Sequence, residues 1–216
     1  GLPIAVKDLC EIEGQITTAG SKDWLNRRST TTSTAVERLL RGGMVMLGKT
    51  HMVEFAFGGF GTNPEMGTPW NPWDLKTHRT PGGSSSGSGV AVAAGLAPAA
   101  LGSDTGGSVR IPASLNGITG LKTTCGLISL HGAFPLSGTL DSIGPMTRDM
   151  EDAALLTELM AGADPRDPAT LNRPLFQWQA PENNAKPLAG TRIAMIPPAQ
   201  YPIAMGADVL RMLDDT

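Results

Sequence analysis

The chain has 216 residues, of which 40% are hydrophobic and 17% are charged, and its formal net charge is −3. This length fits one domain of ordinary size or the central part of a larger one. The negative charge, without any Lys/Arg cluster, argues against direct binding of nucleic acid, and no apolar run is long enough to form a membrane-spanning helix. We therefore expect a cytoplasmic protein that does not associate with a membrane.

Hydrophobic patterns predict strands that alternate with helices along the chain. The expected strands cover residues 2–9, 44–49, 98–103 and 191–197. The expected helices cover residues 32–43, 88–97, 107–117, 148–162 and 206–215. Such alternation predicts an α/β fold with a mixed, mostly parallel β-sheet covered by helices on both faces.

Two short motifs imitate known functional loops. Residues 43–50, GMVMLGKT, match the phosphate-loop pattern, but that loop must follow a strand and open a helix, and here the order is reversed. Residues 83–87, GSSSG, match a nucleophile elbow centred on Ser85, which requires a preceding strand and a later acid and histidine. No strand pattern precedes Ser85 and only His131 follows it. We therefore assign neither a nucleotide site nor an elbow serine.

Lys7 stands inside the apolar run PIAVKDL. A lysine acts as a base only when neutral, so its pKa must fall from about 10.4 to roughly 7–8, a change of about 4 kcal/mol. Burial supplies such a shift because it penalises the ammonium form. A strand-end lysine that reaches solvent is the competing interpretation, and the spacing alone leaves both open.

A second segment, DTGGSVRIPAS, places Ser108 after two glycines at the expected start of a helix. Consecutive amides at such a position form a group of donors that can stabilise an oxyanion. Asp104 and Arg110 can hold this loop through a bidentate ion pair. A glycine-rich turn in which Ser108 merely caps the helix is the alternative.

The two Gly/Ser segments and the upstream lysine together resemble the amidase signature family. That family pairs a GGSS-type segment, here residues 82–88, with a segment of the GSDTGGSVRIP type, here residues 102–112. Ser84 and Ser108 are 24 residues apart, which is typical of the family, and the resemblance continues through residues 117–156. One departure is Thr123, which replaces the usual proline of GLKPT.

The resemblance implies an enzyme that hydrolyses a carboxylic amide to an acid and ammonia or an amine. Ser108 would form the acyl-enzyme, Ser84 on a cis peptide bond would relay the proton, and Lys7 would be the base. The implied oxyanion hole consists of the backbone amides of Thr105, Gly106, Gly107 and Ser108. The implied supporting residues are Ser85, Asp104 and Arg110, and the substrate-side residues are Ala56, Phe57 and Gly58.

Two other functions remain open. The glutaminase (A) subunit of a tRNA-dependent amidotransferase usually shows NMDEFAMGSS where this chain has HMVEFAFGGF, and this difference favours a stand-alone amidase. A non-catalytic protein that keeps the scaffold is disfavoured, because all three implied catalytic positions are filled.

The expected partner is a small-molecule amide, and a homodimer is left open. No metal or organic cofactor is expected. Cys10 and Cys125 lie far apart without metal-ligand spacing, so we expect two reduced, buried thiols. Residues 1–216 are expected to form part of a single amidase-signature domain. Because family members extend further at both ends, we expect a fragment without the N-terminal helices and most of the C-terminal portion.

Overall fold

The computed structural model describes residues 1–179, 190–192 and 194–215. The chain divides into two compact units, Gly1–Trp178 and Gln179–Thr216. The first unit carries all the residues assigned above to a site. In the second unit, the described residues contain one α-helix, α5 (Ala207–Asp214), and no strand. The prediction of a single domain remains a prediction.

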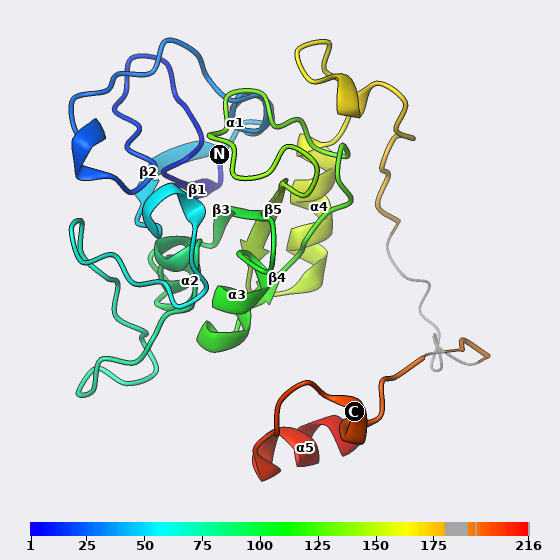
Figure 1. The fold of residues 1–216 in the computed structure, drawn as a ribbon. Helices are drawn as coiled ribbons and strands as arrows, with labels where there is room; N and C mark the ends of the chain where they lie inside the picture. The colour runs from blue at the N-terminus through cyan, green and yellow to red at the C-terminus, as the bar shows by residue number, and fades with distance from the viewer. Residues whose placement is uncertain (180–189, 193, 216) are drawn as a thin grey trace. The chain divides into compact units, whose positions relative to one another are not determined.

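The first unit is built on a mixed five-stranded sheet, in which the strand order is β2-β1-β3-β5-β4 (Figure 1). The strands are β1 (Pro3–Lys7), β2 (Val45–Thr50), β3 (Ala99–Asp104), β4 (Thr119–Gly120) and β5 (Ser142–Thr147). Strand β1 runs parallel to β2 and β3, whereas β5 is antiparallel to β3 and β4. Since β1 and β3 are parallel, their carboxyl ends lie at the same edge of the sheet.

Helices cover both faces of this sheet (Figure 1). They are α1 (Thr34–Arg41), α2 (Ser86–Ala93), α3 (Arg110–Asn116) and α4 (Met150–Met160). Side chains alternate along a strand, so Ile4 and Val6 pack in the core with α1 and α4, while Ala5 packs with α2 and α3. The predicted α/β fold with a mixed sheet is confirmed.

Local signals explain where the helices begin. Ser33 precedes α1, and its hydroxyl accepts a hydrogen bond from the Val36 amide. Asp149 precedes α4, and its carboxylate accepts one from the Asp152 amide at 2.9 Å. Both side chains satisfy amides that lack a partner inside the helix.

Several sequence expectations were wrong. Strand β5 was missed because its sequence, SIGPMT, contains Gly and Pro and shows no alternation, since both of its faces are buried. The strand predicted over 191–197 is absent from its described residues, because a strand needs a hydrogen-bonding neighbour and the second unit offers none among its described residues. Cys125 is partly exposed rather than buried, because it lies in the loop after β4, whereas Cys10 is buried and both are free thiols.

Two further findings concern the described part of the chain. None of its helices is long and apolar enough to cross a membrane. The segment that imitates a phosphate loop forms strand β2 after helix α1, so its middle residues are extended and do not form an anion-binding turn.

Candidate active site

The candidate site lies at the carboxyl ends of β1 and β3. Lys7 is the last residue of β1, and Ser103 and Asp104 end β3. Helix α2 begins immediately after Ser85, which brings the first Gly/Ser segment to the same edge of the sheet. The fold therefore brings together residues far apart in the chain, such as Lys7 and Ser103, which are 96 positions apart.

The Lys7 side chain is fully buried and does not reach solvent. Its Nζ lies 2.7 Å from Ser84 Oγ and 2.8 Å from Ser103 Oγ, and it donates hydrogen bonds to both. Burial lowers the pKa of the Lys7 amine from 10.5 to about 7, although negative groups nearby favour the charged form. A substantial fraction of the amine is therefore neutral at neutral pH.

Two glycines let the chain before Ser84 approach its neighbours closely. Gly82 has φ +71°, and a Cβ there would lie 2.8 Å from Pro112 Cα. A Cβ at Gly83 would lie 2.7 Å from the backbone nitrogen of Gly61. Neither position accepts a larger residue without moving backbone.

Backbone contacts hold Ser84 and its neighbours in place. The Gly83–Ser84 peptide bond is cis, as the resemblance implies. The Gly83 amide donates to the Gly59 carbonyl at 2.7 Å, and the Val53 amide donates to the Ser84 carbonyl at 3.1 Å. Ser84 is therefore fixed from both sides, with its hydroxyl directed at Lys7.

Ser85 joins the two Gly/Ser segments. Its amide donates to the Ser108 carbonyl at 3.2 Å. Its hydroxyl donates to the Ser103 carbonyl and accepts from the Ser103 amide, each at 3.3 Å. This side chain is fully buried and bonded, which argues against an elbow nucleophile at Ser85.

Asp104 organises the loop that leads to α3. Its carboxylate accepts hydrogen bonds from the amides of Gly107 at 2.7 Å and Val109 at 3.1 Å. The Arg110 guanidinium donates to both carboxylate oxygens, from Nε to Oδ2 at 3.1 Å and from Nη2 to Oδ1 at 3.0 Å. Burial alone would raise the pKa of Asp104, but the hydrogen bonds from Arg110 and the amides outweigh it and lower the pKa.

Ser108 presents a hydroxyl that makes no hydrogen bond to any described residue, and the residue keeps 9% of its surface exposed. Of the four amides expected in the oxyanion hole, that of Gly107 is already engaged by Asp104. The amides of Thr105, Gly106 and Ser108 have no partner among the described residues. In the described part of the chain, three of the four amides therefore make no hydrogen bond, whereas that of Gly107 is occupied.

The three substrate-side residues separate in the structure. Ala56 is buried and lines a cavity of about 190 Å³ together with Ser103 and Thr105. Phe57 is 81% exposed and, with Gly58, lines a different pocket. Of the three, Ala56 lines the cavity beside Ser103, while the backbone of Gly58 lies against Gly83, directly before Ser84.

Sequence reasoning missed two residues of this cluster. Ser103 is the second hydroxyl partner of Lys7, and its only signal was its place directly before Asp104 in the glycine-rich segment. Asp141 accepts a hydrogen bond from the Thr105 hydroxyl and lies 36 residues further along the chain. Its part in the cluster appears only in three dimensions.

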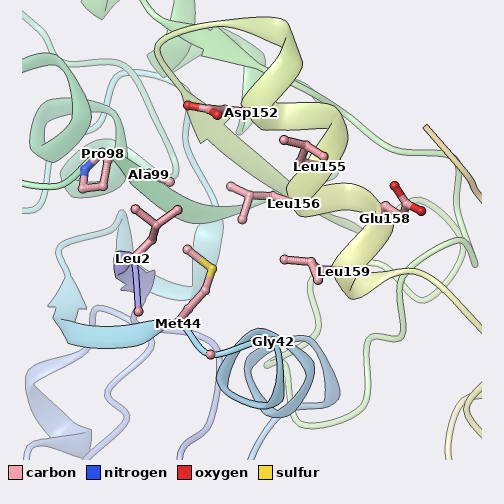
Figure 2. Close-up of a pocket in the computed structure, with 12 residues that line it drawn as sticks. Leu2, Gly42, Met44, Pro98, Ala99, Asp152, Leu155, Leu156, Glu158 and Leu159 are labelled. Carbon is pink, nitrogen blue, oxygen red and sulfur yellow. The ribbon is translucent and has the colours of Figure 1, made fainter. Parts of the chain in front are cut away.

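A larger apolar cavity, of about 620 Å³, lies away from these residues at the starts of β1 and β3. Figure 2 shows Leu2 and Met44 facing Leu155, Leu156 and Leu159 of α4 across it. It contains none of the serines or the lysine described above.

Removing the Asp104 carboxylate tests its control over the loop. Asp104→Ala should destabilise the fold by about 2–3 kcal/mol, because buried amides lose a charged acceptor. It should also lower kcat for the amide hydrolysis that the resemblance implies, roughly 100-fold, by loosening the free donors. Chemical denaturation and steady-state kinetics check both values. The matched control, Arg110→Gln, breaks the ion pair with the fully buried Asp104 carboxylate but keeps the amide hydrogen bonds, so it should cost less stability than Asp104→Ala. Equal losses in the two variants would show that the amide hydrogen bonds to Asp104 add nothing beyond the ion pair.

Comparisons with known proteins identify the class of protein that this fold and site define. The family model described as Amidase matches residues 1–216. The chain belongs to this family, the amidase signature family.

Individual relatives place the chain more closely. The A subunit of glutamyl-tRNA(Gln) amidotransferase from Burkholderia pseudomallei (strain 668) is 48% identical over 223 residues, covering 100% of this chain and 44% of that protein. The crystal structure of the corresponding Thermotoga maritima protein superposes with a TM-score of 0.77 at 44% identity, over 84% of this chain and 40% of that one. The X-ray structure of native peptide amidase from Stenotrophomonas maltophilia superposes with a TM-score of 0.74 at 40% identity, over 80% of this chain and 36% of that one. The chain thus spans less than half the length of the curated relatives it matches.

Proposed function

We propose that the protein containing these residues hydrolyses a carboxylic amide through an acyl-enzyme on Ser108. One observation carries the proposal: the buried Lys7 amine, whose pKa falls to about 7, lies 2.7 Å from Ser84 Oγ. The backbone next to Ser84 is in turn bonded to the Ser108 carbonyl. The base, the relay hydroxyl and a serine whose hydroxyl makes no hydrogen bond to the described residues are therefore linked by hydrogen bonds of side chains and backbone.

In the first half of the reaction, Ser108 Oγ attacks the carbonyl carbon of the amide. Its proton passes to Ser84 Oγ while the Ser84 proton passes to neutral Lys7. The carbonyl oxygen becomes an oxyanion, which the free amides of Thr105, Gly106 and Ser108 stabilise. Lys7 then returns the proton through Ser84 to the departing nitrogen, and the C–N bond breaks.

In the second half, water attacks the acyl-enzyme ester. The water proton follows the same path to Lys7, and Ser108 regains a proton as the acid leaves. A pKa of about 7 suits both halves, because the lysine must accept and return a proton at the same pH.

The two candidate substrate classes have different support. Relatives named as the A subunit of glutamyl-tRNA(Gln) amidotransferase match 97–100% of the chain at 47–48% identity, which favours a glutaminase subunit that releases ammonia for a partner. The loop HMVEFAFGGF and the likeness to a peptide amidase favour a stand-alone amidase. The comparisons thus support the glutaminase more strongly than the stand-alone amidase that the sequence favoured. Cytoplasmic location and a homodimer remain predictions.

A panel of amides separates these two functions. The full-length protein is incubated with glutamine, aliphatic amides, aryl amides and peptide amides, and released ammonia is measured. A glutaminase subunit should act mainly on glutamine and should copurify with its partner proteins. A stand-alone amidase should prefer another amide and purify alone. Ammonia release from none of these amides would contradict the proposed function.

A further inference from the structure

The cavity beside Ser103 and Thr105 carries an inference about the substrate. It measures about 190 Å³ and lies within the first unit. Its apolar wall comes from segments distant in sequence and includes Leu9, Ala56, Leu130, Phe134, Leu136 and Ile143. Thr105, which also lines it, contributes one of the amides left free for an oxyanion. The cavity therefore adjoins the expected oxyanion hole at Thr105 and the Lys7 partner Ser103.

The polar side chains that line this cavity are already engaged. Ser103 Oγ accepts from Lys7, and the Thr105 hydroxyl donates to Asp141. The other Asp141 oxygen accepts from the amides of Leu136 at 2.8 Å and Ser137 at 2.9 Å. A charged ligand group placed here would lose water without gaining a free counter-charge among the described lining residues, which is unfavourable.

We propose that this cavity is the subsite for an apolar substituent of the amide substrate, and that Leu136 sets its size. The proposal rests on the proposed function, since it assumes a carbonyl bound at Ser108. An apolar cavity of about 150 Å³ holds benzene, so this one fits a group of roughly six to eight non-hydrogen atoms. A hexyl to octyl chain or a phenyl ring has suitable size and chemistry.

The substituent can belong to the acyl part or to the amine part of the amide. Both present the same apolar group, and two substrate series separate them. Primary amides of increasing acyl length vary only the acyl part. N-alkyl acetamides of increasing length vary only the amine part. The series whose kcat/KM depends on the size of residue 136 identifies the part that occupies the cavity.

Leu136 is the residue to change, because it is 37% exposed and the hydrogen bond from its backbone amide to Asp141 does not depend on the side chain. Leu136→Ala should move the preferred chain length up by about two carbons. Leu136→Trp should lower kcat/KM for the longest substrates roughly 100-fold relative to that for acetamide, since a methylene in an apolar pocket is worth roughly tenfold or more. Leu140→Ala is the matched control: Leu140 is in the same loop, 55% exposed, and does not line the cavity.

A second measurement covers the case of slow turnover. Alkyl fluorophosphonates of increasing length label an active serine, and their labelling rates should follow the same dependence on residue 136. Turnover or labelling with identical length profiles in wild type, both Leu136 variants and the control would overturn the subsite and leave the proposed function standing. Hydrolysis confined to glutamine would also overturn it. No hydrolysis and no serine labelling would remove both proposals together.

Discussion

Ser108→Ala is expected to abolish amide hydrolysis, with kcat reduced by about 10⁴ to 10⁶-fold, because the variant has no oxygen that can form the acyl-enzyme. The fold should remain intact. The Ser108 hydroxyl makes no hydrogen bond to any described residue, so its loss leaves no buried polar group unsatisfied. Steady-state kinetics and chemical denaturation of the full-length protein measure the two effects.

Ser85→Ala is the matched control for this variant. It removes a buried hydroxyl with contacts of 3.3 Å to the Ser103 backbone, so it should lower stability by about 1–2 kcal/mol and retain a measurable rate. A serine-directed fluorophosphonate should add one label, at Ser108, in the wild-type protein. Retained turnover in Ser108→Ala, or a label at Ser85, would show that another serine is the nucleophile.

Replacement of Lys7 should have a comparable effect on the rate. Lys7→Ala and Lys7→Met both remove the base and should lose amide hydrolysis by at least about 10³-fold. In the wild-type enzyme, kcat/KM should rise with pH as the amine loses its proton and should level off above its pKa of about 7. A pH–rate profile without this limb near neutrality would contradict a neutral lysine base.

The stability of Lys7→Met provides an independent check on the burial of the amine. The unfolded chain holds the lysine proton up to pH 10.5, whereas the folded state releases it near pH 7, so between these values the unfolded state binds more protons. Wild-type stability should therefore rise with pH across this window. The pKa shift corresponds to a penalty of roughly 5 kcal/mol on the stability of the wild type below pH 7. Lys7→Met removes this penalty but also loses two hydrogen bonds of about 1 kcal/mol each.

The variant lacks this penalty, so its advantage over the wild type should be greatest below pH 7 and should shrink as the pH rises. It should become a deficit before pH 10.5, because the variant also lacks the two hydrogen bonds. Urea denaturation at about pH 6, 8 and 10 measures the difference. Parallel wild-type and variant stabilities across this range would indicate an amine with an ordinary pKa.

The serine cluster shows how far local sequence reasoning extends. The Asp104–Arg110 pair was foreseen because both groups stand in one short glycine-rich loop, and the structure shows the bidentate contact. Ser103 was missed as a partner of Lys7, because strand pairing brings together residues that are 96 positions apart. The engagement of the Gly107 amide by Asp104 was missed as well, since it depends on how the loop folds back on its own carboxylate.

The sequence by itself determined the family, the alternation of strands and helices, and the two glycine-serine segments, because these depend on residue types and spacings along the chain. Only the tertiary structure decided whether Lys7 is buried or reaches solvent, which amides remain free, and which of the substrate-side residues meets the cavity. The physical reason is that desolvation and hydrogen-bond occupancy depend on the neighbours of a group in space. At this site those neighbours come from β1, β3 and the start of α2. Hydrophobic patterns and residue propensities describe each of these elements separately and do not show how they meet in space.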